Sequence, residues 1–161
     1  FRIIWLHNKF NIRIAYEILK ERVSPEAFAS GVLTYQTLPH RLQPIGTWKG
    51  IRFYDDSIST TCETAIEAVR TIRNLDAILI GGMDRGIDYA PLIHFLASAD
   101  VPHILLMEAT GERILREAEV LEPDLVSSGR LIRTPHLSDA VETVFDYAER
   151  GLISPGSASS A

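Results

Sequence analysis

The sequence has a single cysteine, lacks long hydrophobic runs and has no excess of basic side chains. Cys62 alone cannot form an internal disulfide, and no apolar run reaches the roughly 20 residues that a membrane-spanning helix needs. Lys and Arg total 16 against 21 Asp and Glu, so the net charge is -5 and no basic field favours nucleic acid or an anionic membrane. We therefore expect a cytoplasmic protein that binds neither nucleic acid nor a membrane.

The composition is that of an ordinary globular chain. The 161 residues are 46% hydrophobic and 23% charged, which excludes disorder of the whole chain. This length provides one α/β domain, or one domain with an attached piece.

The first 36 residues predict a short strand and two helices. Phe1–Leu6 is short and rich in aromatic and β-branched residues, which indicates a strand or the end of one. A helix is expected over residues 9–22, with one apolar face formed by Phe10, Ile14, Ile18 and Leu19. Ser24 and Pro25 then give an N-cap and a first helical position, so a second helix is expected to about Tyr35.

From Gln43 onward, strand and helix patterns alternate. Lys49-Gly50 predicts a hairpin between strands 43–48 and 51–55. Further strands are expected at 77–80, 103–107, 131–133 and 152–153, with helices at 62–73, 89–99, 111–119 and 138–150 and a loop at 154–161. Continuous apolar strands between helices indicate the doubly wound α/β class, a mostly parallel sheet with helices on both faces.

Ligands of such sheets bind beyond the carboxyl ends of the strands, where three loops are of interest. In 55–61, two acids and four hydroxyl residues precede a helix, which suits an anion or a ribose, although one hydroxyl can be a simple N-cap. In 81–86, glycines allow close approach and Arg85 can pair with a carboxylate or phosphate, although a structural turn is the alternative. Small hydroxyl residues in 154–159 can bind an anion or form a loose end.

The remaining reactive side chains give no further site. The five histidines show no metal-ligand spacing, and Cys62 has no nearby histidine partner and is interpreted as structural. From the residues alone, the chain is a carboxylate- or phosphate-binding α/β domain without an assigned reaction.

Five motifs in order, which together extend over nearly the whole chain, resemble the Mur ligases. They are Leu6-His7-Asn8 with Phe10-Asn11, Leu38-Pro39-His40-Arg41, Phe53-Tyr54-Asp55-Asp56-Ser57, Ile80-Gly81-Gly82 with Arg85-Gly86, and Leu152–Ser159. The order and spacing are similar to the branch that joins glutamate to UDP-N-acetylmuramoyl-L-alanine in peptidoglycan precursor synthesis, and so serves cell wall biogenesis, cell shape and cell division.

The resemblance implies a domain division and an ATP-dependent reaction through an acyl phosphate. Residues 1–36 correspond to the end of a central ATPase domain, and 37–161 to a Rossmann-like C-terminal domain that is truncated at its end. By the same resemblance, Asn8, Arg41 and Asp56 bind ATP, whereas Thr60, Arg85 and Ser159 bind glutamate. No catalytic residue or metal ligand is assigned within the chain, and the ligands of Mg²⁺ are expected mainly outside it.

Departures from the family pattern leave the stereochemistry open. Ile58 and Arg85 stand where the pattern has lysine, and Trp5 stands where it has glycine, changes similar to those of a branch that adds L-glutamate in place of D-glutamate. D-glutamate is the first expectation and L-glutamate the alternative. A non-catalytic nucleotide- or amino-acid-binding module is the other alternative. The ligase is expected to be a monomer, and this chain alone to form no product and to bind ATP weakly.

Overall fold

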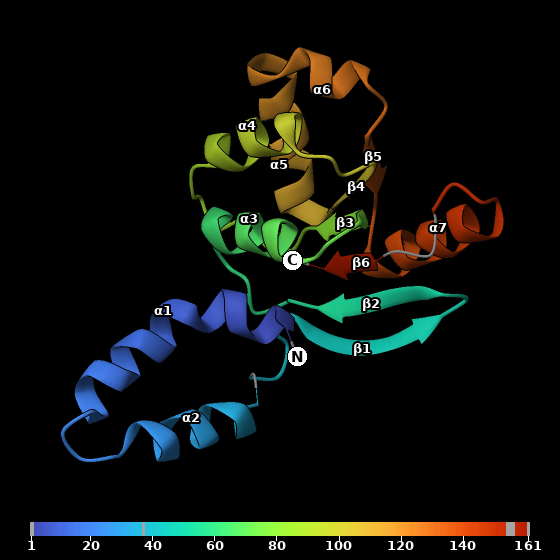
Figure 1. Cartoon of the computed structure of the whole chain (residues 1–161). Coiled ribbons are helices and arrows are strands. Elements are labelled where there is room, and N and C mark those ends of the chain that lie inside the picture. The colour runs from blue at the N-terminus through green and yellow to red at the C-terminus, as the bar shows by residue number, and fades with distance from the viewer. Residues whose placement is uncertain (1, 37, 154–156, 161) are drawn as a thin grey trace. The chain divides into compact units, whose positions relative to one another are not determined.

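A computed structural model describes residues 2–36, 38–153 and 157–160, with side chains for 8–36 and 38–153. The chain divides into two compact units, Phe1–Pro39 and His40–Ala161 (Figure 1). Each unit is described by itself.

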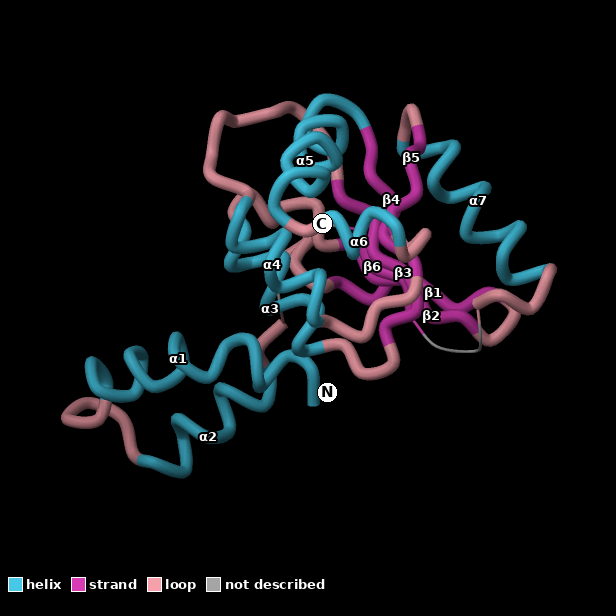
Figure 2. The backbone as a smooth tube through the Cα atoms, turned by 90° about the horizontal axis from the view of Figure 1, so that it is seen from above, coloured by secondary structure: helices cyan, strands magenta, loops and turns pink. Residues whose placement is uncertain are grey.

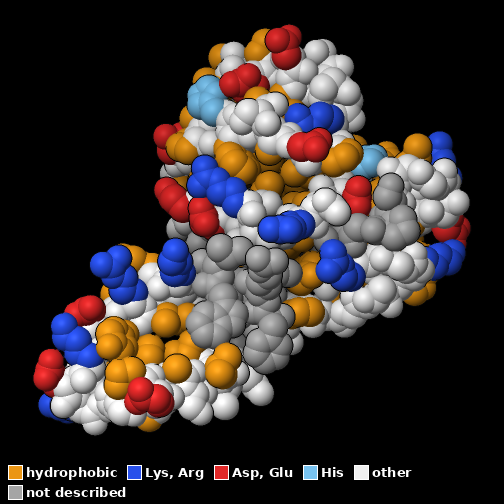
Figure 3. All heavy atoms as spheres, viewed as in Figure 1, with side chains coloured by type: hydrophobic (Ala, Val, Ile, Leu, Met, Phe, Trp, Pro, Cys, Tyr) orange, Lys and Arg blue, Asp and Glu red, His pale blue; other side chains and the backbone are white. Residues whose placement is uncertain are grey.

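The first unit is a pair of helices, α1 (Arg2–Leu19) and α2 (Pro25–Thr34). Ser24 caps α2 by accepting a hydrogen bond from the Ala27 N–H at 3.2 Å, as its position before Pro25 predicts. The rings of Tyr16 and Phe28 meet edge to face at 5.2 Å between centroids. No residue of α2 is buried, and over residues 8–19 of α1 only Asn8 is buried. Hydrophobic side chains gather on the surface of the helix pair (Figure 3).

The predicted strand at the start of the chain is wrong, because residues 2–6 form the first turns of α1. A short apolar run fits a strand and a buried helix equally well, and only its continuation decides between them. Here the run continues without a turn residue into the amphipathic stretch that follows. The helix also ends at Leu19, three residues before the predicted end at Arg22.

The second unit contains a six-stranded sheet in the order β1-β2-β6-β3-β4-β5. The strands are β1 (Gln43–Trp48), β2 (Ile51–Asp55), β3 (Leu75–Ile80), β4 (His103–Met107), β5 (Leu131–Thr134) and β6 (Ser157–Ser160). Only β1, paired with β2 in the predicted hairpin, is antiparallel. Lys49 and Gly50 both take left-handed backbone angles (φ 47° and 82°), which matches the twist of a two-residue hairpin turn.

Helices cover both faces of this sheet, as Figure 2 shows with α3, α4 and α5 on one side and α7 on the other. They are α3 (Cys62–Thr71), α4 (Ala90–Ser98), α5 (Glu108–Leu121), α6 (Pro123–Ser127) and α7 (Leu137–Glu149). The doubly wound, mostly parallel α/β class predicted from the sequence is therefore confirmed. The short helix α6, which follows Glu122, was not predicted.

The two faces of the sheet are filled by alternate residues of the same strands. Ala77 and Leu79 of β3 belong to the cluster that includes Val144 of α7. Ile78 and Ile80, one residue out of phase, point to the other face and are equally buried. Burial on both faces explains why β3 is a continuous apolar run rather than an alternating one.

The last predicted strand and the predicted loop after it are both wrong. Leu152 and Ile153 lie outside any strand, whereas Ser157–Ser160 forms β6 in the middle of the sheet, between β2 and β3. A Ser/Ala sequence has little intrinsic strand preference, so its conformation comes from pairing on both edges with strands that are distant in sequence. Residues 154–156 of the predicted loop lie outside the described residues.

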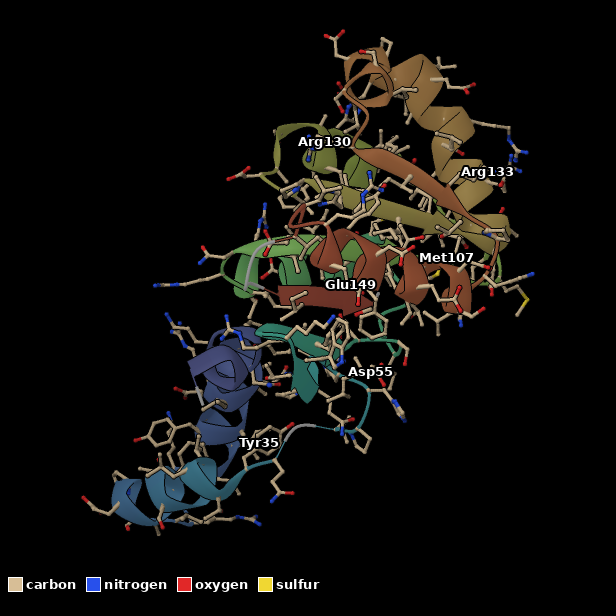
Figure 4. All side chains as sticks on the ribbon, turned by 90° about the vertical axis from the view of Figure 1, so that its right-hand side faces the viewer. Tyr35, Asp55, Met107, Arg130, Arg133 and Glu149 are labelled. Atoms are coloured by element: carbon tan, nitrogen blue, oxygen red, sulfur yellow. The ribbon has the colours of Figure 1, made fainter. Side chains whose placement is uncertain are left out.

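Two close contacts hold the helices on this sheet. A Cβ added to Gly111 of α5 would lie 2.6 Å from the carbonyl carbon of Leu106, so the helix backbone lies almost against β4. Arg130, labelled in Figure 4, donates hydrogen bonds to the backbone carbonyls at and beyond the end of α4, namely those of Leu96, Ala97, Ala99 and Val101. Its guanidinium thus satisfies acceptors that a helix end leaves unpaired.

Candidate active site

The candidate site lies at the edge of the sheet where the parallel strands end. Asp55 closes β2 and Met107 closes β4 (Figure 4), and Ile80 closes β3 between them. Ser160 pairs with Asp55 and with Leu79, so β6 ends at the same edge. The loops that follow β2 and β3 are therefore neighbours, as expected for an open parallel sheet.

Asp56 is a buried hydrogen-bond acceptor in the loop that follows β2. Its side chain is fully buried, and its two oxygens accept hydrogen bonds from the Leu42 N–H at 2.9 Å and from the Ser59 hydroxyl at 2.5 Å. The Ile58 N–H also donates to the His40 carbonyl at 3.2 Å. Asp56 thus ties the segment at residues 40–42 to the loop after β2. Both oxygens of this buried carboxylate are therefore engaged within the protein.

His40 and Asp55 form a second tie between the same segments. Nδ1 of His40 lies 2.7 Å from an oxygen of Asp55, and the other oxygen accepts the Ser57 N–H at 3.0 Å. Burial raises the pKa of Asp55, but these hydrogen bonds outweigh it and lower the pKa below its ordinary value. Asp55 is therefore held as a carboxylate at neutral pH.

The hydroxyl residues before α3 have separate roles. Thr61 is the N-cap, with its hydroxyl accepting from the Thr64 N–H in a capping box. The Ser59 hydroxyl donates to Asp56. Thr60 is exposed and serves neither purpose. The simple capping interpretation thus holds for Thr61 and leaves Thr60 available to a ligand.

The second loop brings backbone and a guanidinium to the site. A Cβ at Gly81 would lie 2.6 Å from that of Met107, and Gly82 has φ 108°, so both positions require glycine for different reasons. Arg85 is exposed and makes no ion pair with any described residue. Its planar fork is suited to bidentate contact with a carboxylate.

Two adjoining pockets, of about 490 and 70 Å³, contain these groups. Both are lined by the same residues of the two loops: Ser59, Thr60, Gly81, Met83 and Arg85. The larger pocket also has an apolar wall from β1, β2 and α7. A small anion with an aliphatic portion matches this combination of one cation, hydroxyls and apolar surface.

The structure brings together only some of the predicted site residues. Thr60 and Arg85 share the pockets, Asp56 lies beneath the first loop, and Arg41 is half-buried next to Leu42. Asn8 belongs to the other unit, where it is buried on α1 and accepts a hydrogen bond from Asn11 at 3.4 Å. The Ser159 side chain lies outside the described part, although its backbone pairs with Tyr54 and Ile78.

Glu108 was missed by the sequence analysis. It lines the larger pocket and has φ 55°, an unfavourable angle for a residue with a side chain. Its position directly after β4 could have marked it as a candidate, because the loops that contain Thr60 and Arg85 also follow strands of the parallel sheet. Backbone strain of this kind concentrates at functional positions.

Cys62 has the properties of a structural residue. It is buried, its thiol donates to the Asp88 carbonyl at 3.2 Å, and burial raises the pKa of the thiol. A raised pKa disfavours the reactive thiolate at neutral pH.

A resident metal has no ligand set in the described residues. Across 2–36, 38–153 and 157–160, no three His, Cys, Asp or Glu side chains are grouped to hold an ion. In the same ranges, no helix combines the length and the apolar character needed to cross a membrane.

The fold defines the chain's second unit as an α/β domain of the doubly wound class, with its candidate site where the parallel strands end. No protein-family profile matches the chain. Over 97% of its length, however, it is 30% identical to the UDP-N-acetylmuramoylalanine–D-glutamate ligase of Chlamydia abortus, covering 37% of that protein. It is also 31% identical to the UDP-N-acetylmuramoyl-L-alanine–L-glutamate ligase of a Micromonospora species. That match extends over 86% of this chain and 33% of the relative.

Solved structures show the same fold at lower identity. MurF from Acinetobacter baumannii superposes with a TM-score of 0.71 over 96% of this chain and 33% of its own, at 18% identity. The folylpolyglutamate synthase of Mycobacterium tuberculosis, complexed with ADP, gives a TM-score of 0.60 over 86% of this chain and 32% of its own, at 15% identity. The chain is therefore a homologue of one part of the Mur ligases and spans about a third of the length of these relatives.

Proposed function

We propose that this chain is part of an ATP-dependent ligase that joins D-glutamate to UDP-N-acetylmuramoyl-L-alanine. The observation that carries the proposal is the shared pocket of Thr60 and Arg85, which offers a hydroxyl and a free guanidinium to a carboxylate. The 30% identity to a D-glutamate ligase over nearly the whole chain supports this substrate.

The residues of this chain hold and orient the incoming amino acid. Arg85 pairs with one carboxylate of glutamate and Thr60 donates a hydrogen bond to it, while Ser159 binds the other carboxylate. ATP supplies the phosphoryl group that activates the carboxylate of the precursor. The neutral amine of glutamate then attacks the carbonyl carbon of the acyl phosphate. The amide C–N bond forms as the C–O bond to phosphate breaks, inorganic phosphate leaves, and the amine nitrogen gives up one proton to solvent. Fixing the amine near this carbon makes the step effectively unimolecular.

The second part of the proposal concerns the nucleotide. Asn8 and Arg41 are the proposed contacts of ATP, and Asp56 contacts the ribose after exchanging its hydrogen bond with Ser59. Residues 1–36 are assigned to the end of a central ATPase domain and 37–161 to a C-terminal domain. The ligands of Mg²⁺ are expected mainly outside this chain. We place the reaction in the cytoplasm and expect a monomer, which gel filtration tests.

The test is ADP release by the full-length protein encoded by the native gene, with UDP-N-acetylmuramoyl-L-alanine and each glutamate enantiomer. D-glutamate is expected to stimulate ADP release. The L enantiomer is the second candidate, because a relative named as an L-glutamate ligase is equally similar at 31% identity. Stimulation by neither enantiomer would overturn the proposed substrate. The isolated chain of 161 residues is expected to form no product.

Arg85→Ala tests the site itself. It is expected to raise the KM for glutamate about tenfold or more, because it removes a charge-assisted hydrogen bond to a carboxylate. The matched control is Arg133→Gln, which removes an exposed arginine that pairs with Glu112 outside the pockets. An unchanged KM in Arg85→Ala would remove Arg85 from the site.

A further inference from the structure

The loop that carries Arg85 is tied to helix α5 by an ion pair outside the pockets. Nη1 of Arg113, on α5, donates to the two oxygens of Asp84 at 3.0 and 3.3 Å. The same carboxylate accepts the Gly86 N–H at 2.9 Å. Asp84, which precedes Arg85, is therefore linked both to Gly86, which follows Arg85, and to helix α5. These bonds lower the pKa of Asp84, which is therefore ionised at neutral pH.

The Arg113 guanidinium is itself fixed from two further directions. Its Nε donates to Glu117, one turn along the same helix, at 2.7 Å. Its central carbon lies 5.0 Å from the ring centroid of Tyr89, a cation–π contact, and the Tyr89 hydroxyl reaches Asp84 at 3.4 Å. A guanidinium held in one plane by Glu117 and Tyr89 positions its third partner, Asp84, with little freedom.

The start of the loop is attached to α5 separately. The Thr110 N–H donates to the Gly82 carbonyl at 3.1 Å, and the backbone at Gly81 lies close against Met107. The loop is therefore held at residues 81–82 by backbone contacts and at Asp84 by Arg113. Arg85, the next residue, is exposed and without an ion pair among the described side chains.

We propose that Arg113 is a positioning residue for the glutamate site, which it serves by engaging Asp84 so that Arg85 is left for the substrate. Without Arg113, the Asp84 carboxylate would have no ion-pair partner on α5 and, as the neighbour of Arg85 in sequence, would compete with the substrate for the Arg85 guanidinium. The inference rests on the proposed function, since it concerns the binding of an amino acid that carries carboxylates. Arg113 lies on α5, a helix that supplies none of the side chains proposed to contact the carboxylates of glutamate.

The test compares single and double variants of the full-length protein by the KM for glutamate. Arg113→Gln is expected to raise this KM about tenfold, and Asp84→Asn about threefold, because Asn keeps the acceptor for Gly86 and adds no free charge. The double variant Asp84→Asn/Arg113→Gln is expected to resemble Asp84→Asn, so that removing the second charge partly restores binding. The kcat at saturating glutamate and the KM for ATP are expected to stay at their wild-type values.

Two controls separate positioning from general damage. In an Arg85→Ala background, Arg113→Gln is expected to have no further effect on the KM for glutamate, which a purely structural role would not predict. Arg113→Lys keeps the charge and serves if the glutamine variant does not fold; it is expected to stay within about threefold of wild type. The melting temperature of each variant is measured alongside.

The outcomes distinguish the two proposals. If the wild-type protein shows no glutamate-dependent ADP release, the proposed function fails. If the wild type is active but Arg113→Gln leaves the KM unchanged, the positioning role is overturned. It is overturned equally if the double variant is worse than Arg113→Gln or if the effect persists without Arg85.

Discussion

The two units of the chain carry similar helical patterns but bury them differently. On α1, Phe10 is 73% exposed and Ile18 is 69% exposed, although both lie on the predicted apolar face. In the second unit, Ile93 of α4 is fully buried and Ile114 of α5 is 1% exposed. An amphipathic pattern thus predicts that a helix forms, but only the surroundings decide whether its face is covered. Hydrophobic stabilisation in this chain resides mainly in the second unit.

The largest effect is expected from a cavity in that core. Ile104→Ala removes buried atoms from the centre of β4 and is expected to cost about 3–4 kcal/mol of unfolding free energy, since the surrounding helices cannot fully close the space. Urea denaturation followed by circular dichroism measures this loss. Ile18→Ala in the first unit is the control and is expected to change stability by less than about 0.5 kcal/mol. Equal losses at the two positions would contradict the contrast between the units.

Glycine substitutions should have opposite signs in the two units. Gly111→Ala places a Cβ against the Leu106 backbone and is expected to cost about 3 kcal/mol, because neither helix α5 nor strand β4 can easily move. Gly31, on α2, has open space around its added Cβ, and Gly31→Ala is expected to stabilise its helix by about 0.5–1 kcal/mol. Thermal melting of both variants and the helical circular dichroism signal provide the comparison. A tolerated Gly111→Ala would show that α5 is not held tightly on the sheet.

A smaller loss is expected at the end of α4. Arg130→Ala leaves the carbonyls of Leu96, Ala97, Ala99 and Val101 without this donor and is expected to cost about 2 kcal/mol, since water can reach some of them. Arg130→Lys keeps the charge but not the fork and is expected to recover only part of the loss. Urea midpoints of the two variants check this order.

The smallest effect is a pH dependence in the second unit. The pKa of Asp55 is lower in the folded chain than its ordinary value, so its contribution to stability is present above about pH 4 and is lost as the pH falls through the folded pKa. Between pH 7 and pH 3, Asp55→Asn is therefore expected to lose less stability than the wild type. Glu142→Gln, at an exposed carboxylate of α7, is the control and is expected to follow the wild type. Parallel losses in Asp55→Asn and the wild type would refute the assignment.

Sequence periodicity predicted the strands and helices whose own apolar residues are buried in the core. The strand at 103–107 has the predicted bounds, and α7 is displaced by a single residue at each end. The pattern failed where conformation depends on distant partners, as in Ser157–Ser160, or where a short apolar run fits two structures, as in residues 2–6.

The candidate site divides in the same way. Thr60 and Arg85 could be found because each follows a strand of a parallel sheet, and such positions converge in space. Arg113 could not be found, since its role arises from a contact with Asp84 across 29 positions of sequence and it looks like any charged residue on the outer face of a helix. Residues that bind are marked by local chemistry, whereas residues that position them are marked only by the fold.

The central place of β6 has a consequence for the order in which the chain can fold. Of the six described strands, β6 joins the β1–β2 hairpin to the β3–β4–β5 half of the sheet, yet it follows the other five in sequence. During synthesis, the hairpin and the three-stranded half can each form early, but they remain separate until β6 has emerged and inserted between them. Until then, β2 and β3 each present an unpaired edge that is open to wrong pairing.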